Sequence, residues 1–184
     1  EAYYQGNGIY KSIDGGLSWD SLSSTATNTP HSFDNDFDFI WNIVTDPSND
    51  SMDVIYAATY GSIYRSADGG ASWSKSINGG NAYHNNVAIT SNGVVYATLS
   101  SDGSSSGRGI WRSDDGINWT KINDAMFPPI YARIAIGINP LNENEIYFLA
   151  AETDGYGQHT DVFFGGETWT SLWKYEYLSG NGTG

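Results

Sequence analysis

The chain has 184 residues, and its 21 acidic against 8 basic side chains give it a formal net charge of −13 and an isoelectric point near 4.2. This charge argues against nucleic acid and anionic membranes as partners, because phosphate binding needs a basic surface. The sequence has 0 cysteines and no apolar run long enough to span a membrane, which excludes disulfide support, thiol chemistry and a transmembrane segment.

The first predicted element is a short strand at 8–11, and a signature of eight residues follows it at Ser12–Trp19, with the sequence Ser-Ile-Asp-Gly-Gly-Leu-Ser-Trp. The signature returns at Ser66–Trp73 and, one residue shorter, at Ser113–Trp119. Its tryptophans lie 54 and 46 residues apart. A repeat of this length is typical of stacked or circular arrays of one structural unit.

Four strands are predicted in each repeat, because apolar and polar residues alternate in similar phrases around each signature. First strands are predicted at 39–45, 86–90 and 132–136, second strands at 53–57, 93–97 and 145–148, third strands at 8–11, 62–65, 109–112 and 171–174, and fourth strands at 74–77 and 120–122. Each signature then falls in the hairpin between a third and a fourth strand. Four antiparallel strands in roughly fifty residues predict an all-β fold made of β-propeller blades.

The predicted blades divide the chain into the end of one blade at 1–30, complete blades at 36–80 and 84–125, and an incomplete blade of three strands at 130–184. Two complete blades cannot close a ring, since propellers need about four to eight. We therefore expect a fragment of a larger propeller, of about six to eight blades. Its nearest partners would be the remaining blades of the same chain.

The signature resembles the Asp-box, or BNR repeat, of sialidase-like β-propellers, whose pattern is S-x-D-x-G-x-x-W. The first two copies match it well, and the third lacks the second glycine. The resemblance spans essentially the whole chain and implies that the boxes lie on the face away from the ligand site. The phrasing at 39–44 and 172–175 is most similar to exported bacterial proteins that use type IX secretion, which implies a location outside the bacterial cell or on its surface.

The three signature aspartates, Asp14, Asp68 and Asp115, are predicted to be structural. A carboxylate at this position can accept hydrogen bonds from backbone amides that the tight turn leaves without partners. The signature tryptophans, Trp19, Trp73 and Trp119, are predicted to fold back onto the blade and bury apolar area. A shared catalytic or metal site made of the three acids is the weaker hypothesis, because they belong to separate blades.

Candidate ligand contacts are expected at the opposite ends of the strands, where the loop insertions concentrate. They are Asp36, Asp38, Tyr60, Tyr83, His84, Arg108, Tyr131, His159 and Asp161. This mixture of aromatic and polar side chains suits a carbohydrate, or a protein at a surface. No cofactor is expected; calcium at the alternating Asp34, Asp36 and Asp38 is the alternative, although the EF-hand pattern fails at Phe39, where it needs glycine.

The main functional hypothesis is a non-catalytic propeller module of a secreted or cell-surface protein, acting in adhesion or in glycan or protein binding. One alternative is a glycoside hydrolase of the sialidase-like or xyloglucan-hydrolysing type, in which two of Asp36, Glu152 and Asp161 would act as acid and base; another is a structural stalk or sheath unit. Sialidase activity is disfavoured, because Arg133-Ile134-Ala135 lacks the proline of the Arg-Ile-Pro motif. Ser21 and Ser51 stand in Asp-Ser-aliphatic triplets that resemble acceptors of a bacterial O-glycosylation system.

Overall fold

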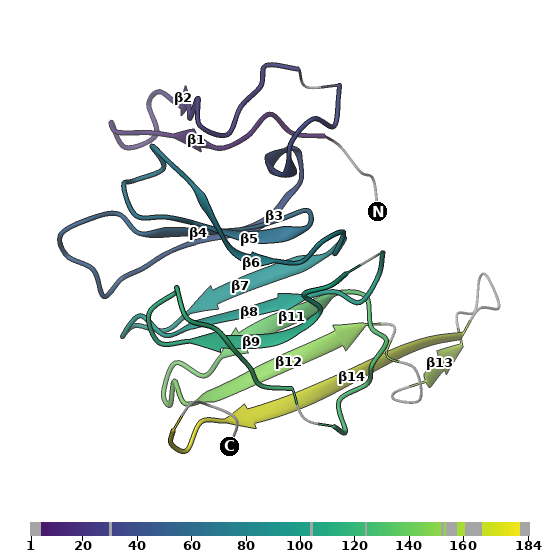
Figure 1. The fold of residues 1–184 in the computed structure, drawn as a ribbon. Coiled ribbons are helices and arrows are strands. Elements are labelled where there is room, and N and C mark those ends of the chain that lie inside the picture. Colours follow the sequence, from purple (N-terminus) through teal and green to yellow (C-terminus); the bar gives the residue numbers. More distant parts are fainter. Residues whose placement is uncertain are drawn as a thin grey trace.

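The computed structural model describes residues 5–29, 31–103, 105–123, 125–151, 153, 158–160 and 167–180, with the backbone alone at 158–160, 167 and 168. These residues form four antiparallel sheets that follow one another along the chain (Figure 1). The helical content among them is one short 3-10 turn, η1 (Asp36–Asp38). The prediction of an all-β fold of propeller blades is confirmed.

The first three sheets pair their strands in simple chain order. The first consists of β1 (Tyr10–Lys11) and β2 (Asp20–Ser21). The second consists of β3 (Ile40–Thr45), β4 (Ile55–Thr59), β5 (Ser62–Ser66) and β6 (Ser74–Asn78). The third consists of β7 (Asn85–Ile89), β8 (Val95–Leu99), β9 (Gly109–Ser113) and β10 (Thr120–Lys121).

The fourth sheet has one strand more than the sequence predicted. Its order is β11 (Ile134–Ile138), β12 (Glu145–Ala151), β14 (Glu167–Glu176) and β13 (Gln158–Thr160). The insertion after β12 was expected to be a loop, because the three residues of β13 show no apolar alternation. β14 is longer than β12, and its first residues, 167–169, offer a free edge with which β13 pairs.

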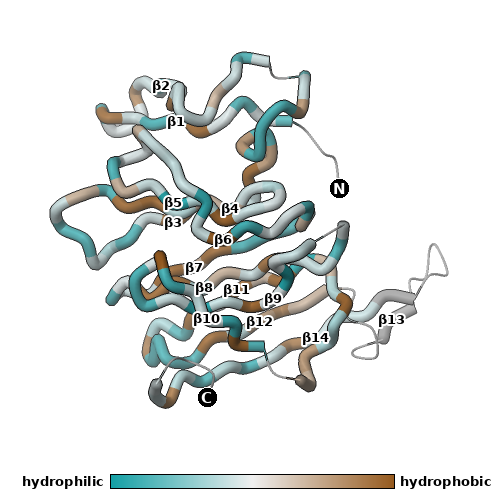
Figure 2. Tube along the Cα trace, in the orientation of Figure 1, coloured by the Kyte–Doolittle hydropathy of each residue, from teal (hydrophilic) through white to brown (hydrophobic). Residues whose placement is uncertain are grey.

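The hydrophobic core lies between successive sheets (Figure 2). In β8 the residues alternate between two clusters: Val95, Ala97 and Leu99 pack toward the second sheet, and Tyr96 packs in the cluster shared with the fourth. All five residues of β8 are buried. The third sheet is therefore covered on both faces, as expected of a repeat that buries apolar area against its neighbours.

The first strands of the second, third and fourth sheets, β3, β7 and β11, contact one another in turn. Asn42 in β3 links two of them, because its side-chain amide donates to Asn86 Oδ1 at 2.8 Å and to the Val87 carbonyl at 2.7 Å. Asn42 thus ties the second sheet to the third along these strands.

Each signature lies in a hairpin between a third and a fourth strand, as predicted: β1–β2, β5–β6 and β9–β10. In the second copy, Asp68 accepts hydrogen bonds from Ser66 Oγ (2.7 Å), the Ser72 amide (2.9 Å) and Ser72 Oγ (2.6 Å). Asp14 makes the same set of bonds with Ser12 and Ser18. We call these three segments the signature turns.

The third signature turn is shorter, yet its carboxylate also accepts hydrogen bonds from backbone amides of the turn. Asp115 accepts from the amides of Ile117 (2.8 Å) and Asn118 (2.7 Å) and from the Asn118 side chain (2.7 Å). The loss of the second glycine therefore moves the amide partners one residue closer without removing them.

The second and third signature turns also contact the sheet before them. Ser24 Oγ, which follows β2, donates to the Gly70 carbonyl at 2.6 Å, and Ser76 Oγ in β6 donates to the Gly116 carbonyl at 2.7 Å. The Trp119 indole N–H donates to the same Ser76 hydroxyl at 2.9 Å. Trp119 is partly buried against the core, whereas Trp19 in the first turn is 61% exposed. Within the part of the chain that the structure describes, Trp19 therefore does not follow the prediction of a tryptophan that folds back onto the blade.

Candidate functional site

The signature turns and the predicted ligand contacts that the structure describes lie at opposite ends of the strands. Successive hairpins of an antiparallel sheet alternate between the two ends, so the β5–β6 turn lies opposite the β4–β5 turn at 60–61 and the connection 79–84. We call these the signature end and the shelf end.

At the shelf end, five aromatic side chains form a cluster that we call the aromatic shelf. Its members are Phe33, Phe39, Trp41, Tyr60 and Tyr83. The rings of Tyr60 and Tyr83 stack with centroids 5.7 Å apart, and those of Phe39 and Trp41 stack at 6.4 Å. Four of the five line a groove of about 420 Å³, all but Phe33. Tyr83 is 42% exposed and Phe33 is 47% exposed, so the shelf presents apolar ring surface to solvent.

A bulge in β3 places Trp41 on the shelf. Ile40 pairs with Thr59 and Asn42 pairs with Ala58, so the register of the two strands shifts by one residue at Trp41. A bulge of this kind re-aims one side chain out of the regular alternation. The shelf is completed by hydrogen bonds between loops, since the Tyr60 amide donates to the Phe39 carbonyl (2.8 Å) and the Gly61 amide donates to the Ala82 carbonyl (2.9 Å).

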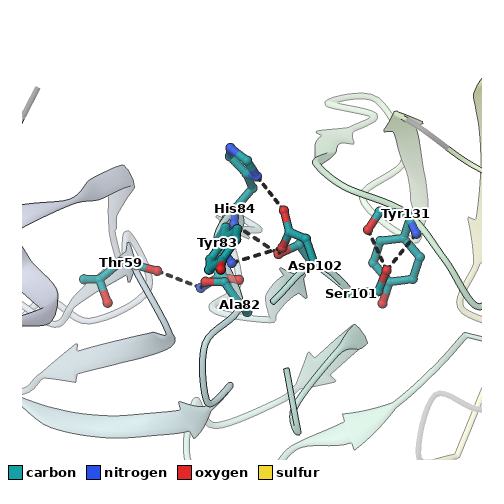
Figure 3. A network of polar contacts seen from close by, with 9 residues as sticks. Thr59, Ala82, Tyr83, His84, Ser101, Asp102 and Tyr131 are labelled. Atoms are coloured by element: carbon teal, nitrogen blue, oxygen red, sulfur yellow. Dashed lines mark hydrogen bonds and ion pairs between the residues drawn. The ribbon is translucent and has the colours of Figure 1, made fainter. Parts of the chain in front are cut away.

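Beside the shelf, His84 and Asp102 form a pair whose ring nitrogen and carboxylate oxygen, Nδ1 and Oδ2, are 2.9 Å apart (Figure 3). The His84 ring also packs on Trp41, with centroids 5.0 Å apart. Asp102 Oδ1 accepts from the Tyr83 amide at 3.1 Å and from the Ser100 hydroxyl. Since an ionised carboxylate can only accept, this contact is a hydrogen bond when His84 carries a proton on Nδ1.

The two predicted aspartates of η1 have different surroundings. Asp36 accepts from Tyr64 Oη and from Lys75 Nζ, each at 2.9 Å. Burial opposes the charge on Lys75, but the Asp36 carboxylate outweighs it and raises the pKa of that amine. Asp38 is 2% exposed and accepts from the amides of Asp34 and Asn35, so it closes the turn and does not face the groove.

Two of the remaining predicted contacts, Tyr131 and Arg108, lie at the shelf end. Tyr131 is 3% exposed, its hydroxyl donates to the Leu99 carbonyl at 3.2 Å, and burial raises its pKa. It is therefore a packing residue. Arg108 is exposed on the β8–β9 insertion. His159 contributes its backbone to β13, and its side chain, like Asp161, lies outside the described residues.

The structure thus brings together Tyr60, Tyr83 and His84, with Asp36 close to the turn at Gly61. The sequence did not identify Trp41, Phe39 or Asp102 as site residues. Phe39 and Trp41 are two residues apart at the start of a predicted first strand and were given no role in ligand binding. The antiparallel pairing of that strand with the next one, which ends beside Tyr60, was the signal that could have found them. Asp102 lies in a polar insertion without a distinguishing pattern.

Outside the site, Ser21 in β2 and Ser51 in the turn after β3 are both exposed, and Ser51 Oγ donates to Asn49 Oδ1 at 2.9 Å. Across the described ranges, no three His, Cys, Asp or Glu side chains come together in a way that could hold a metal ion. The Asp34 carboxylate accepts hydrogen bonds from the hydroxyls of Thr27 and Thr29. In the same residues there is no helix of the length and apolarity that a membrane crossing requires.

Comparison with known proteins finds carbohydrate-active relatives. No family model matches the chain. The xyloglucanase Xgh74A of Acetivibrio thermocellus is 26% identical over 197 residues, which cover 92% of this chain and 23% of that protein. The chain therefore spans about a quarter of the length of this relative.

Two solved structures share the fold. The GH74 enzyme of Niastella koreensis superposes with a TM-score of 0.62 at 21% identity, covering 91% of this chain and 24% of that enzyme. An ancestral GH74 enzyme superposes with a TM-score of 0.54 at 20% identity, covering 97% and 24%. At these identities the structures show a common fold.

Proposed function

We propose that the chain is the substrate-binding part of a glycoside hydrolase that acts on a plant-type polysaccharide such as xyloglucan. The observation that carries this proposal is the aromatic shelf and its groove. Two stacked pairs of rings offer flat apolar surface on which the C–H faces of sugars can pack, and polar groups stand beside it to bind hydroxyls. The names of the relatives support a glycan as the ligand.

The relatives favour the hydrolase hypothesis over the non-catalytic module. Glycoside hydrolysis needs two carboxylates about 5–10 Å apart, one of them free to protonate the leaving oxygen. Of the three carboxylates nominated as acid or base, Asp36 is paired with Lys75, and Glu152 and Asp161 lie outside the described residues. We therefore assign the described residues to holding the substrate, and the catalytic acid and base to other parts of the full-length protein.

The same proposal places the protein outside the cell, where polysaccharides of this kind occur. The hydrogen bonds of the signature turns fit the Asp-box resemblance. The proposal also includes export to a bacterial surface by type IX secretion, and only the sequence phrases support this part.

The test uses the full-length protein with xyloglucan oligosaccharides, a sialoside and a mixed-linkage β-glucan. We expect turnover of xyloglucan by the wild type. The Trp41→Ala variant should bind xyloglucan oligosaccharides with an affinity about tenfold lower, because a stacking surface is removed. Trp19→Ala is the matched control: it removes an exposed tryptophan at the signature end and should leave binding unchanged. Tight binding without turnover would support the non-catalytic module instead, and no binding would contradict the proposal.

A further inference from the structure

The insertion between β8 and β9 begins with residues 100–103, which we call the bridging turn. Its side chains bind alternately to the two neighbouring segments (Figure 3). Ser100 Oγ accepts from the His84 amide at 3.0 Å, and Asp102 holds the Tyr83 amide and the His84 ring. Ser101 turns the other way and exchanges hydrogen bonds with the backbone of Tyr131, at 2.8 Å in each direction.

The bridging turn also packs closely against the shelf. Gly103 has a φ of +65°, and a Cβ there would lie 2.3 Å from the Asn81 carbonyl oxygen and 2.9 Å from Cε1 of the Tyr83 ring. The Tyr83 ring therefore rests on a position that only glycine can occupy. The corresponding turn of the second sheet, 60–61, has no room for such a support, because it is only two residues long.

We propose that Asp102 is a positioning residue of the aromatic shelf. One of its oxygens fixes the backbone of Tyr83, which sets the stack of that ring on Tyr60, and the other fixes the ring of His84 against Trp41. Asp102 thereby controls two of the four rings that line the groove. The proposal rests on the proposed function, since the shelf is taken to bind the glycan.

Two substitutions of Asp102 should affect its contacts with Tyr83 and His84 differently. Alanine at 102 removes the acceptor of the Tyr83 amide and the partner of His84 together. Asparagine keeps an oxygen for the Tyr83 amide but presents an NH₂ group to His84 Nδ1, which demands the other neutral tautomer of the ring. Asp102→Asn should therefore keep the backbone in place and alter only the histidine.

The first experiment needs no ligand. Hydrogen exchange of the full-length protein is followed by mass spectrometry in the peptide that covers 81–86. We expect about tenfold faster exchange in Asp102→Ala than in the wild type, and near wild-type exchange in Asp102→Asn. Asp46→Ala is the matched control, because Asp46 likewise accepts from an amide and a hydroxyl two residues on, those of Ser48, at the signature end.

The second experiment measures the affinity for a xyloglucan oligosaccharide. We expect about tenfold weaker binding in Asp102→Ala and no change in Asp46→Ala, with the melting temperatures of the two variants showing that each is folded. Exchange and affinity that both stay at the wild-type level in Asp102→Ala would overturn the positioning role. A wild type that binds no glycan would contradict the proposed function alone, because the exchange comparison decides the role of Asp102 without ligand.

Discussion

The two ends of the sheets are built on opposite principles. At the signature end, each aspartate accepts hydrogen bonds from backbone amides of its own turn, and similar bonds recur at Asp14, Asp68 and Asp115. At the shelf end, the bonds join segments far apart in the chain, such as His84 with Asp102, and they differ from sheet to sheet. Repetition serves stability, and the departures from it make the surface that can bind a ligand.

The largest effect is expected at the signature end, where the third turn meets the second sheet. A Cβ on Gly116 would lie 1.7 Å from the Tyr56 hydroxyl oxygen, and φ there is +67°. Gly116→Ala should lower the free energy of unfolding by roughly 2–4 kcal/mol. Gly15→Ala, with φ +74° and no atom within 4 Å, should cost about 1 kcal/mol. Equal melting temperatures for the two variants would refute this account of turn docking.

A smaller and different effect is expected at the shelf end. Tyr83→Ala should weaken glycan binding about fivefold, because one ring of a stacked pair is lost, and should leave the melting temperature unchanged, because the ring is 42% exposed. Calorimetric titration and thermal melting of one preparation give both numbers. A large drop in melting temperature would mean that the shelf is part of the core.

The reverse pattern is expected of Asp68→Ala. Its turn amide and two hydroxyls would lose their common acceptor, so the melting temperature should fall by a few degrees while glycan affinity stays the same. Asp50→Ala, an exposed aspartate at the same end, is the control. If Asp68→Ala abolished binding or turnover with the melting temperature intact, the signature aspartates would be functional and not structural.

The smallest effect is a pH dependence of stability. Hydrogen bonds from the Ser72 hydroxyl and amide lower the pKa of Asp68 to about 2. Since the folded pKa lies below the ordinary value of 3.8, the stabilisation is present above pH 4 and disappears as the pH falls toward 2. Urea unfolding between pH 5 and 2 should show a shallower loss of stability in Asp68→Asn than in the wild type. Parallel curves would argue against these bonds in solution.

The sequence predicted the part of the molecule that local chemistry determines. Each signature carries its turn, its acceptor and its flanking strands within a short segment, so hairpin positions followed from the residues alone. The shelf depends on events that no local pattern reports: a bulge turns Trp41 out of β3, and Asp102 meets His84 from another loop. Asp38 and Tyr131 have polar groups suited to a ligand, but tertiary packing buries both.

The docking of the second and third signature turns, each on the sheet before it, gives the array a direction. The serines that receive the turns, Ser24 and Ser76, precede the carbonyls of Gly70 and Gly116 in the chain. A newly synthesised sheet therefore finds its docking surface already folded behind it, and we expect folding to advance from the N-terminus as the chain leaves the ribosome. Protease protection of stalled nascent chains, appearing sheet by sheet, would be the sign of such growth. In an array assembled in this way, each new sheet packs on the sheet that was synthesised and folded before it.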